Sequence, residues 1–339
     1  MRILKYLLFL AIAAVLAGYI LMHKKNYQVI TGEVFGTYYT VKLRSFNEDK
    51  MLQKALKEEF DKINSQMSVF DNESEISAIN RAPAGEWIEL SKDMQNLLKN
   101  AYSIYQMSSG AFDPTVGKLV DLWGFGTKGG IQKIPDDEEI REILQFTGFD
   151  KITFSRDFSK LNKKYDKTII NLSAIAKGYG VDSVAAMLTE HGYTDFVVEI
   201  GGEVVAKGKK SDARNGWNIG VADPKDNGES NAFVVTLKDY AAATSGDYRN
   251  FFYIGDKKYS HTINPKTGYP VENALLSVTV FDKSCMNADG LATAIMSMGE
   301  KKAIDFIKDK NLAAVLFVRD EKGDIYPIIS AKASKMGIK

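Results

Sequence analysis

The order of the strand and helix patterns in the second half of the chain constrains the fold most strongly. Short runs rich in β-branched and aromatic residues are typical of strands, and here several follow one another closely enough to be antiparallel neighbours. We predict strands at residues 168–172, 195–200, 217–221, 233–237, 251–254, 276–281 and 313–318. Helical spacing predicts helices at residues 173–190, 288–298 and 301–310. Clustered strands followed by helices favour an α+β fold with mixed or antiparallel sheets over a doubly wound parallel sheet.

The first half adds one strand and three helices. An alternating run at 37–43 predicts the strand, and apolar residues at helical spacing predict a helix at 49–67. Ser91 is placed to cap a second helix that continues to residue 105, and Pro135 opens a third helix. The glycine-dense stretch 123–130 is expected to be a loop. Neither a dinucleotide-binding nor a P-loop glycine motif occurs between a strand and a helix, which argues against both folds.

Length and charge limit the organisation and the partners. A chain of 339 residues with 45% hydrophobic residues allows one large domain or two intimately joined ones, and we predict that residues 26–339 form one compact, two-lobed catalytic unit. Lys and Arg number 44 against 43 Asp and Glu, a formal charge of +1 without a basic stripe. This balance argues against nucleic-acid binding.

Residues 1–25 differ from the rest and predict a signal peptide or an N-terminal membrane anchor. Arg2 and Lys5 precede seventeen uncharged residues, 6–22, which two lysines follow. That length is short for a membrane span and slightly long for a signal core, so a cleaved signal and an uncleaved anchor both remain. Either reading places the body of the protein on the periplasmic side of the cytoplasmic membrane. Tyr19 occupies the position where a lipoprotein signal needs cysteine, which excludes lipidation there.

Cys285 is the only cysteine, so the chain can form no intramolecular disulfide. A lone thiol in an exported protein is expected to be buried in the core rather than to act as a nucleophile.

Asp289 and Thr293 are the first candidates for chemistry. If residues 287–293 are helical, the two side chains lie one turn apart on the same face. A carboxylate and a hydroxyl are hard oxygen donors that suit Mg²⁺, which keeps water or phosphate oxygens at its other positions. The alternative is an ordinary polar helix face.

His261 is the most credible base among three histidines. It lies among polar turn residues just upstream of the Asp289 segment, whereas His23 flanks the hydrophobic stretch. His191 precedes a glycine at a helix end, where a cation complements the helix dipole. Asp289 or Asp247 could also accept the proton.

Four further segments combine turn residues with polar side chains. Residues 171–180 lead from a strand into a helix whose free amides and Lys177 could attract an anion; a solvated lysine is the alternative. The paired glycines at 201–202 permit close approach of a ligand or simply a tight turn. Residues 110–114 could contact a ring or a ribose, or end a helix. Arg249 could bind a phosphate, or form a surface ion pair.

Six motifs in a fixed order resemble the ApbE family of FAD:protein FMN transferases. They are AFDP at 111–114, NLSAIAKGY at 171–179, EIGGE at 199–203, TSGDY at 244–248, SHTINPKTG at 260–268 and ADGLAT at 288–293. The resemblance covers roughly residues 30–320.

The resemblance implies an enzyme that binds FAD and Mg²⁺ and cleaves the FAD pyrophosphate. FMN is joined through a phosphoester to a Thr or Ser of an exported acceptor protein with a Ser/Thr-Gly-Ala-Thr type motif, and AMP leaves. The implied metal ligands are Asp289, Thr293 and the backbone oxygen of Ala174, with Ala292 alongside. The implied FAD contacts are Ala111, Phe112, Asp113, Asn171, Lys177, Ile263 and the segment around Phe35.

Two positions depart from the family pattern. Phe35 stands where Met is common, and Phe70 stands where a tyrosine hydroxyl is common; Phe70 can still stack on a ring of FAD. Two other functions use the same pocket: a Mg²⁺-dependent FAD pyrophosphatase that gives FMN and AMP, and a flavin-binding protein without turnover.

Overall fold

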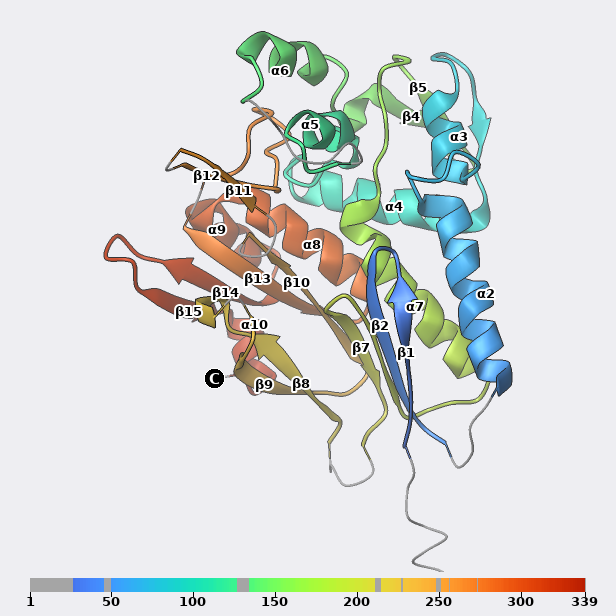
Figure 1. The fold of residues 1–339 in the computed structure, drawn as a ribbon, viewed down its shortest axis with the longest axis vertical. Coiled ribbons are helices and arrows are strands. Elements are labelled where there is room, and N and C mark those ends of the chain that lie inside the picture. Colours follow the sequence, from blue (N-terminus) through green and yellow to red (C-terminus); the bar gives the residue numbers. More distant parts are fainter. Residues whose placement is uncertain are drawn as a thin grey trace, which may run out of the picture.

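An eight-stranded sheet forms the centre of the molecule, and every neighbouring pair in it is antiparallel (Figure 1). The computed structural model describes residues 27–45, 50–126, 134–210, 215–226, 228–247, 251–255, 257–272 and 274–338. In spatial order the strands are β1 (Tyr27–Val34), β2 (Thr37–Arg44), β6 (Phe196–Ile200), β7 (Glu203–Lys207), β10 (Tyr240–Gly246), β13 (Leu275–Asp282), β14 (Ala313–Arg319) and β15 (Ile325–Ile329). The antiparallel sheet confirms the predicted α+β class.

Two different layers cover the faces of this sheet. One face packs against the helices α2 (Lys50–Met67), α7 (Ser173–Glu190), α8 (Cys285–Met298) and α9 (Glu300–Asp309). The opposite face packs against a two-stranded hairpin, β8 (Trp217–Ala222) and β9 (Asn231–Leu237), and against α10 (Ala331–Lys335). Side chains of successive strand residues point to opposite faces, so both layers bury apolar side chains of the same strands.

A second lobe lies beyond the helical layer, at the top of Figure 1. It contains the helices α3 (Glu75–Arg81), α4 (Lys92–Met107), α5 (Gly117–Leu122) and α6 (Asp137–Leu144). Its strands are β3 (Ile88–Glu89), β4 (Ile152–Phe154) and β5 (Lys160–Lys163), with the hairpin β11 (Phe251–Ile254) and β12 (Lys257–Ser260) nearby. Residues of α4 and α8 share one apolar core, which joins the two lobes.

The predicted helices agree with the structure better than the predicted strands. The helix predicted at 288–298 begins three residues earlier, because Ser284 caps the amide of Asn287. The strand predicted at 168–172 is wrong. That segment pairs with no strand; the Asn80 side chain accepts from the Ile170 amide at 2.7 Å and donates to its carbonyl at 2.9 Å. There, hydrogen bonds to a side chain take the place of the backbone hydrogen bonds between paired strands.

Some predictions lie outside the described residues. These are the N-terminal segment 1–25 with Tyr19 and His23, residues 127–130 of the expected loop, and Arg249. Within the ranges that the structure describes, none of the helices has both the length and the apolar character needed to cross a membrane.

Candidate active site

A cavity of about 840 Å³ opens between the two lobes and reaches the end of the central sheet. Its wall is built by the segment before α5, the first turns of α7, the face of α8, the β6–β7 turn, β10 and the residues after β12. Eleven of the predicted site residues lie on this wall: Phe70, Ala111, Phe112, Asp113, Asn171, Ala174, Lys177, His261, Ile263, Asp289 and Thr293. Segments far apart in the sequence therefore meet at one site.

Two predicted residues do not line the cavity. Phe35 lies in the two-residue β1–β2 turn with a positive φ of 52°, and its ring packs edge-on against Phe60 with centroids 6.1 Å apart. The same ring fills the space beside Gly180, where an added Cβ would come within 2.8 Å of it. Tyr38, which follows this turn, lies on the cavity wall. The contact of Phe35 with FAD that the family resemblance implies stays a prediction. Ala292 is fully buried in α8, behind Thr293.

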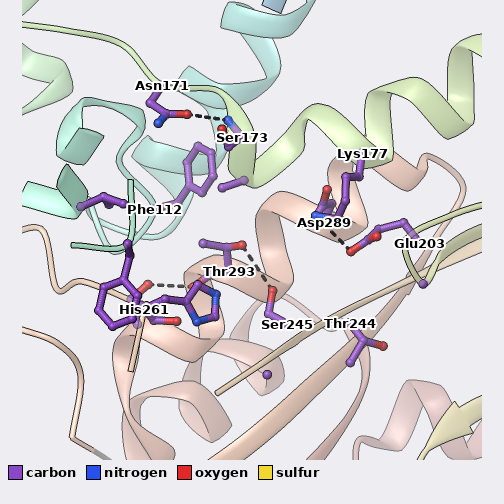
Figure 2. Close-up of a pocket in the computed structure, with 18 of the residues that line it drawn as sticks. Phe112, Asn171, Ser173, Lys177, Glu203, Thr244, Ser245, His261, Asp289 and Thr293 are labelled. Carbon is purple, nitrogen blue, oxygen red and sulfur yellow. Dashed lines mark hydrogen bonds and ion pairs between the residues drawn. The ribbon is translucent and has the colours of Figure 1, made fainter. Parts of the chain in front are cut away.

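Asp289, Lys177 and Glu203 form a charged cluster at the inner end of the cavity (Figure 2). Asp289 is 2% exposed, and its Oδ2 accepts a hydrogen bond from the Gly178 amide at 3.0 Å. The Lys177 Nζ lies 3.4 Å from Oε1 of Glu203. The other oxygen of Glu203, Oε2, is buried and has no hydrogen-bond partner among the described residues. An orphaned buried oxygen indicates that the cluster is completed by something that binds in the cavity.

The protonation of this cluster follows from two carboxyls sharing one ammonium group. Burial raises the pKa of Asp289, and it raises the pKa of Glu203 to about 8 despite the opposing charge of Lys177. Lys177 has its pKa raised above the usual value, chiefly by the charge of Asp289 and against the cost of its own burial. The cluster is therefore short of positive charge, which a divalent cation beside Asp289 would supply.

Oxygen donors continue from Asp289 along the cavity wall. Thr293 follows one turn later on α8, and its Oγ1 lies 3.3 Å from Oγ of Ser245 on β10. Ala174, in the first turn of α7, lines the same wall. The described part of the chain contains no group of three or more His, Cys, Asp or Glu side chains that could enclose a metal. A single carboxylate with hydroxyl and carbonyl oxygens fits Mg²⁺, because this ion is usually held by one or two carboxylates together with water and substrate phosphates.

The helices α7 and α8 approach each other closely at Gly178. A Cβ at this position would lie 2.5 Å from the Cys285 carbonyl oxygen and 2.8 Å from the Met286 Cα. One turn further along α7, Asp182 caps the start of α8. Its carboxylate accepts from the Ser284 hydroxyl at 2.7 Å and from the amides of Cys285 and Met286 at 2.9 and 3.0 Å. These contacts fix Ala174 and Lys177 relative to Asp289 and Thr293.

Replacing Asp182 by alanine should lower the free energy of unfolding by about 1–3 kcal/mol, because buried donors at a helix start lose their acceptor. Urea unfolding of the purified domain measures this change. Asp305, an exposed residue of α9, offers a control: Asp305→Ala should leave stability within about 0.5 kcal/mol of the native value. Equal stability of Asp182→Ala and the native protein would contradict the capping role.

The polar groups near the opposite wall are largely engaged within the protein. The Asp113 carboxylate accepts from the Thr115 amide at 2.8 Å, the Thr115 hydroxyl at 2.6 Å and the Phe149 amide at 3.1 Å. Asn171 Oδ1 accepts from the Ser173 amide at 2.9 Å. Ser297 donates to the Ala111 carbonyl at 2.7 Å, which ties the wall to α8. Asp113 and Asn171 therefore shape the cavity, and their predicted contacts with FAD stay predictions.

His261 follows β12 and lies on the cavity wall beside Phe125, with the ring centroids 6.2 Å apart. Figure 2 shows its imidazole on the side of the cavity where Thr293 and Ser245 lie. Asp247 is not on the wall, and one of its oxygens lies 3.6 Å from Lys258 Nζ. His191 caps the end of α7, where its Nδ1 lies 2.9 Å from the Met187 carbonyl oxygen. The geometry favours His261 over both as the base.

Cys285 is fully buried, as predicted. Its Sγ lies 3.7 Å from the Val204 carbonyl oxygen, and burial raises the pKa of the thiol well above its usual value. A buried, protonated thiol is a packing residue and not a nucleophile.

Glu203 and Ser245 were not predicted as site residues. Both lie in motifs that the sequence displays. The contact of Glu203 with Lys177, and that of Ser245 with Thr293, depends on how β7 and β10 pack against α7 and α8. The hairpin β8–β9, which adds Asn218, Gly220 and Asn231 to the wall, was also not predicted to border the site.

The fold is that of solved ApbE flavin transferases. The structure superposes on flavin transferase ApbE from Vibrio cholerae with a TM-score of 0.84 at 35% identity, covering 92% of this chain and 99% of that one. The ApbE protein from Thermotoga maritima gives 0.80 at 30% identity, with 92% and 99% covered. The FAD:protein FMN transferase of Haemophilus influenzae is 36% identical over 310 residues, 89% of each chain.

The ApbE family as a whole matches residues 35–317. The chain belongs to the ApbE family, as its six ordered motifs predicted.

Proposed function

We propose that this chain is a Mg²⁺-dependent FAD:protein FMN transferase that attaches FMN to a Thr or Ser of an exported acceptor protein and releases AMP. The transferase activity follows from family membership, because relatives that match it over most of their length carry that activity in their names. The observation that supports the metal is the pair Asp289 and Thr293 on the wall of a cavity of about 840 Å³, with Lys177 beside it. A cavity of this volume lies within the usual range for cofactor-sized ligands.

The chemistry is one displacement at phosphorus. The acceptor hydroxyl oxygen attacks the phosphorus of the FMN half of FAD, the bond from that phosphorus to the bridging oxygen breaks, and AMP leaves with that oxygen. Asp289, Thr293 and the Ala174 carbonyl would hold Mg²⁺, which when bound neutralises negative charge that builds on the phosphate oxygens. Lys177 adds a fixed positive charge near them. His261 takes the proton of the attacking hydroxyl.

The fates of AMP and FMN distinguish this function from its alternatives. With FAD, Mg²⁺ and an acceptor that carries a Ser/Thr-Gly-Ala-Thr motif, we expect one AMP released for each FMN attached, and no release after EDTA. A pyrophosphatase would release free FMN without any acceptor, and a non-catalytic flavin-binding protein would leave FAD intact. Chromatography of the nucleotides measures all three outcomes.

Replacing His261 by glutamine should lower kcat by about 10²- to 10⁴-fold, the usual contribution of a positioned base. FAD affinity should change little, because the ring is expected to act on the acceptor proton. His191→Gln, at the far end of α7, is the matched control and should keep native kcat. Native kcat in His261→Gln would exclude the ring as the base.

We also infer that residues 1–25 place the catalytic unit on the periplasmic side of the membrane, either as an uncleaved anchor or as a signal peptide for export. The support is the sequence: an uncharged stretch of seventeen residues between positively charged flanks, without a cysteine for lipidation at Tyr19. Protease treatment of intact and of permeabilised cells tests the location. Protection of the catalytic unit until the inner membrane is broken would contradict it.

A further inference from the structure

A second cavity continues the candidate active site. It has a volume of about 480 Å³ and is lined by Thr40, Lys42, Val197, Glu199, Lys210, Trp217, Asn218 and Ile219. Val197, Glu199, Asn218 and Ile219 also line the larger cavity. The two cavities therefore adjoin, and we call the smaller one, lined by these eight residues, the outer groove.

The outer groove lies on the face of the sheet that is opposite to Asp289. Along β2 and β6, Val41 and Val198 point into the core under α7, so Lys42, Val197 and Glu199 point to the other face. Asp289 and Lys177 approach from the helical side. The larger cavity is lined by residues of both faces, and between them lies the turn Gly201–Gly202.

This turn is open on its Gly202 side. Both glycines have positive φ, 58° and 101°, and no heavy atom lies within 4 Å of where a Gly202 Cβ would be. A group that passes the turn on the Gly202 side therefore meets no side chain, whereas at Gly201 an added Cβ would lie 2.9 Å from Thr37 and 3.3 Å from Lys177.

One side of the outer groove is formed by β8, a strand with one unpaired edge among the described residues. β8 pairs only with β9 in the described structure, and β9 lies toward β14, where the Phe233 and Phe317 rings are 5.9 Å apart. Trp217, Asn218 and Ile219 of β8 border the groove. An unpaired strand edge carries free amides and carbonyls that readily take up another extended chain.

The charges of the groove indicate which chain would fit. The Lys42 ammonium contacts the Tyr27 ring, with Nζ 5.7 Å from the centroid, and has no carboxylate partner among the described residues. Lys210 lies on the same groove. The Lys42 ammonium, at the end remote from Asp289, favours a segment with an acidic residue there, while Glu199 lies nearer the active site.

We propose that the outer groove binds the extended segment of the acceptor protein that carries the target hydroxyl. The segment adds as a strand to the free edge of β8, its acidic residue lies at Lys42, and its hydroxyl passes the Gly201–Gly202 turn to reach the pyrophosphate of FAD. This inference rests on the proposed transferase function, since only an enzyme with a protein acceptor needs a second entrance.

The decisive variant is Lys42→Glu, assayed with two synthetic peptides that carry the Ser/Thr-Gly-Ala-Thr motif flanked by aspartate or by lysine. For the native enzyme we expect the aspartate peptide to have a KM about tenfold lower. Lys42→Glu should reverse this preference and leave the KM for FAD unchanged. Lys301→Glu, on the exposed surface of α9, is the matched control and should keep the native preference. Thermal unfolding shows whether Lys42→Glu is folded.

Hydrogen exchange locates the peptide independently of charge. In the absence of Mg²⁺, saturating aspartate peptide should slow exchange of the amides in Trp217–Ala222. An unchanged peptide preference in folded Lys42→Glu, or protection confined to other elements, would overturn the groove while the transferase function stands. If the native enzyme modifies neither of the peptides and no intact acceptor protein, the proposed transferase function is wrong, and the proposed role of the outer groove is wrong with it.

Discussion

Replacing Asp289 by alanine is expected to reduce FMN transfer by at least about 10³-fold while the fold is kept. The carboxylate lies one turn before Thr293 on α8, and the charge stabilisation that a metal gives to a phosphoryl transition state is worth several kcal/mol. The fold should survive, because Lys177 still has Glu203 as its partner at 3.4 Å. Steady-state transfer to an acceptor, followed by flavin fluorescence of the protein, measures the loss.

Asp289→Asn separates charge from shape. It keeps an acceptor oxygen for the Gly178 amide but removes the negative charge, so it should lose nearly as much activity as Asp289→Ala. Mg²⁺ with FAD should raise the Tm of the native protein, because a ligand that binds only the folded state stabilises it, and should raise that of neither variant. Native transfer rates in either variant, or an undiminished Mg²⁺-dependent rise in Tm, would remove Asp289 from the metal site.

Replacing Gly178 by alanine should damage stability and activity together. The added Cβ would lie 2.5 Å from the Cys285 carbonyl oxygen, and backbone atoms of a packed helix cannot move aside as a flexible side chain can. Overpacking of this kind costs about 1–3 kcal/mol. Because α7 carries Ala174 and Lys177, a shift of α7 from α8 of about 1 Å should also lower transfer about 10²-fold.

Gly180→Ala provides the matched control for this prediction. It is the same substitution on the same helix, but the nearest atoms to the new Cβ belong to the side chains of Phe35 and Ile200. Side chains can adjust, so Gly180→Ala should lower Tm less and retain most of the activity. Urea unfolding and transfer kinetics on both variants test the comparison. Equal effects of the two substitutions would contradict a special role for the α7–α8 contact.

The sequence predicted local features of this fold well and pairings less well. Helices such as Lys50–Met67 depend on apolar residues at helical spacing, which one segment displays by itself. The segment 168–172 has the composition of a strand, but its amides and carbonyls meet the Asn80 side chain and the Pro114 carbonyl instead of another strand. Pairing partners are a property of the whole fold, so composition alone did not exclude a strand there.

The candidate site shows the same difference between local features, which the sequence predicts, and contacts between distant segments, which it does not. Asp289 and Thr293 could be paired from the sequence, because both lie on one helix. Glu203 could not, because its approach to Lys177 requires β7 to lie against α7 and α8. Phe35 was placed at the site by family resemblance alone, and in the structure its ring contacts that of Phe60. That β8 pairs only with β9 among the described residues could not be foreseen either, since pairing partners are a property of the whole fold.

The intact mass of an acceptor protein tests the central claim most directly. Native enzyme, FAD and Mg²⁺ should increase the mass of an acceptor with a Ser/Thr-Gly-Ala-Thr motif by one FMN less water, located on a Thr or Ser of that motif. The same incubation with Asp289→Ala, or with EDTA, should leave the mass unchanged. An unmodified acceptor with the native enzyme, or equal modification with and without Mg²⁺, would contradict the account.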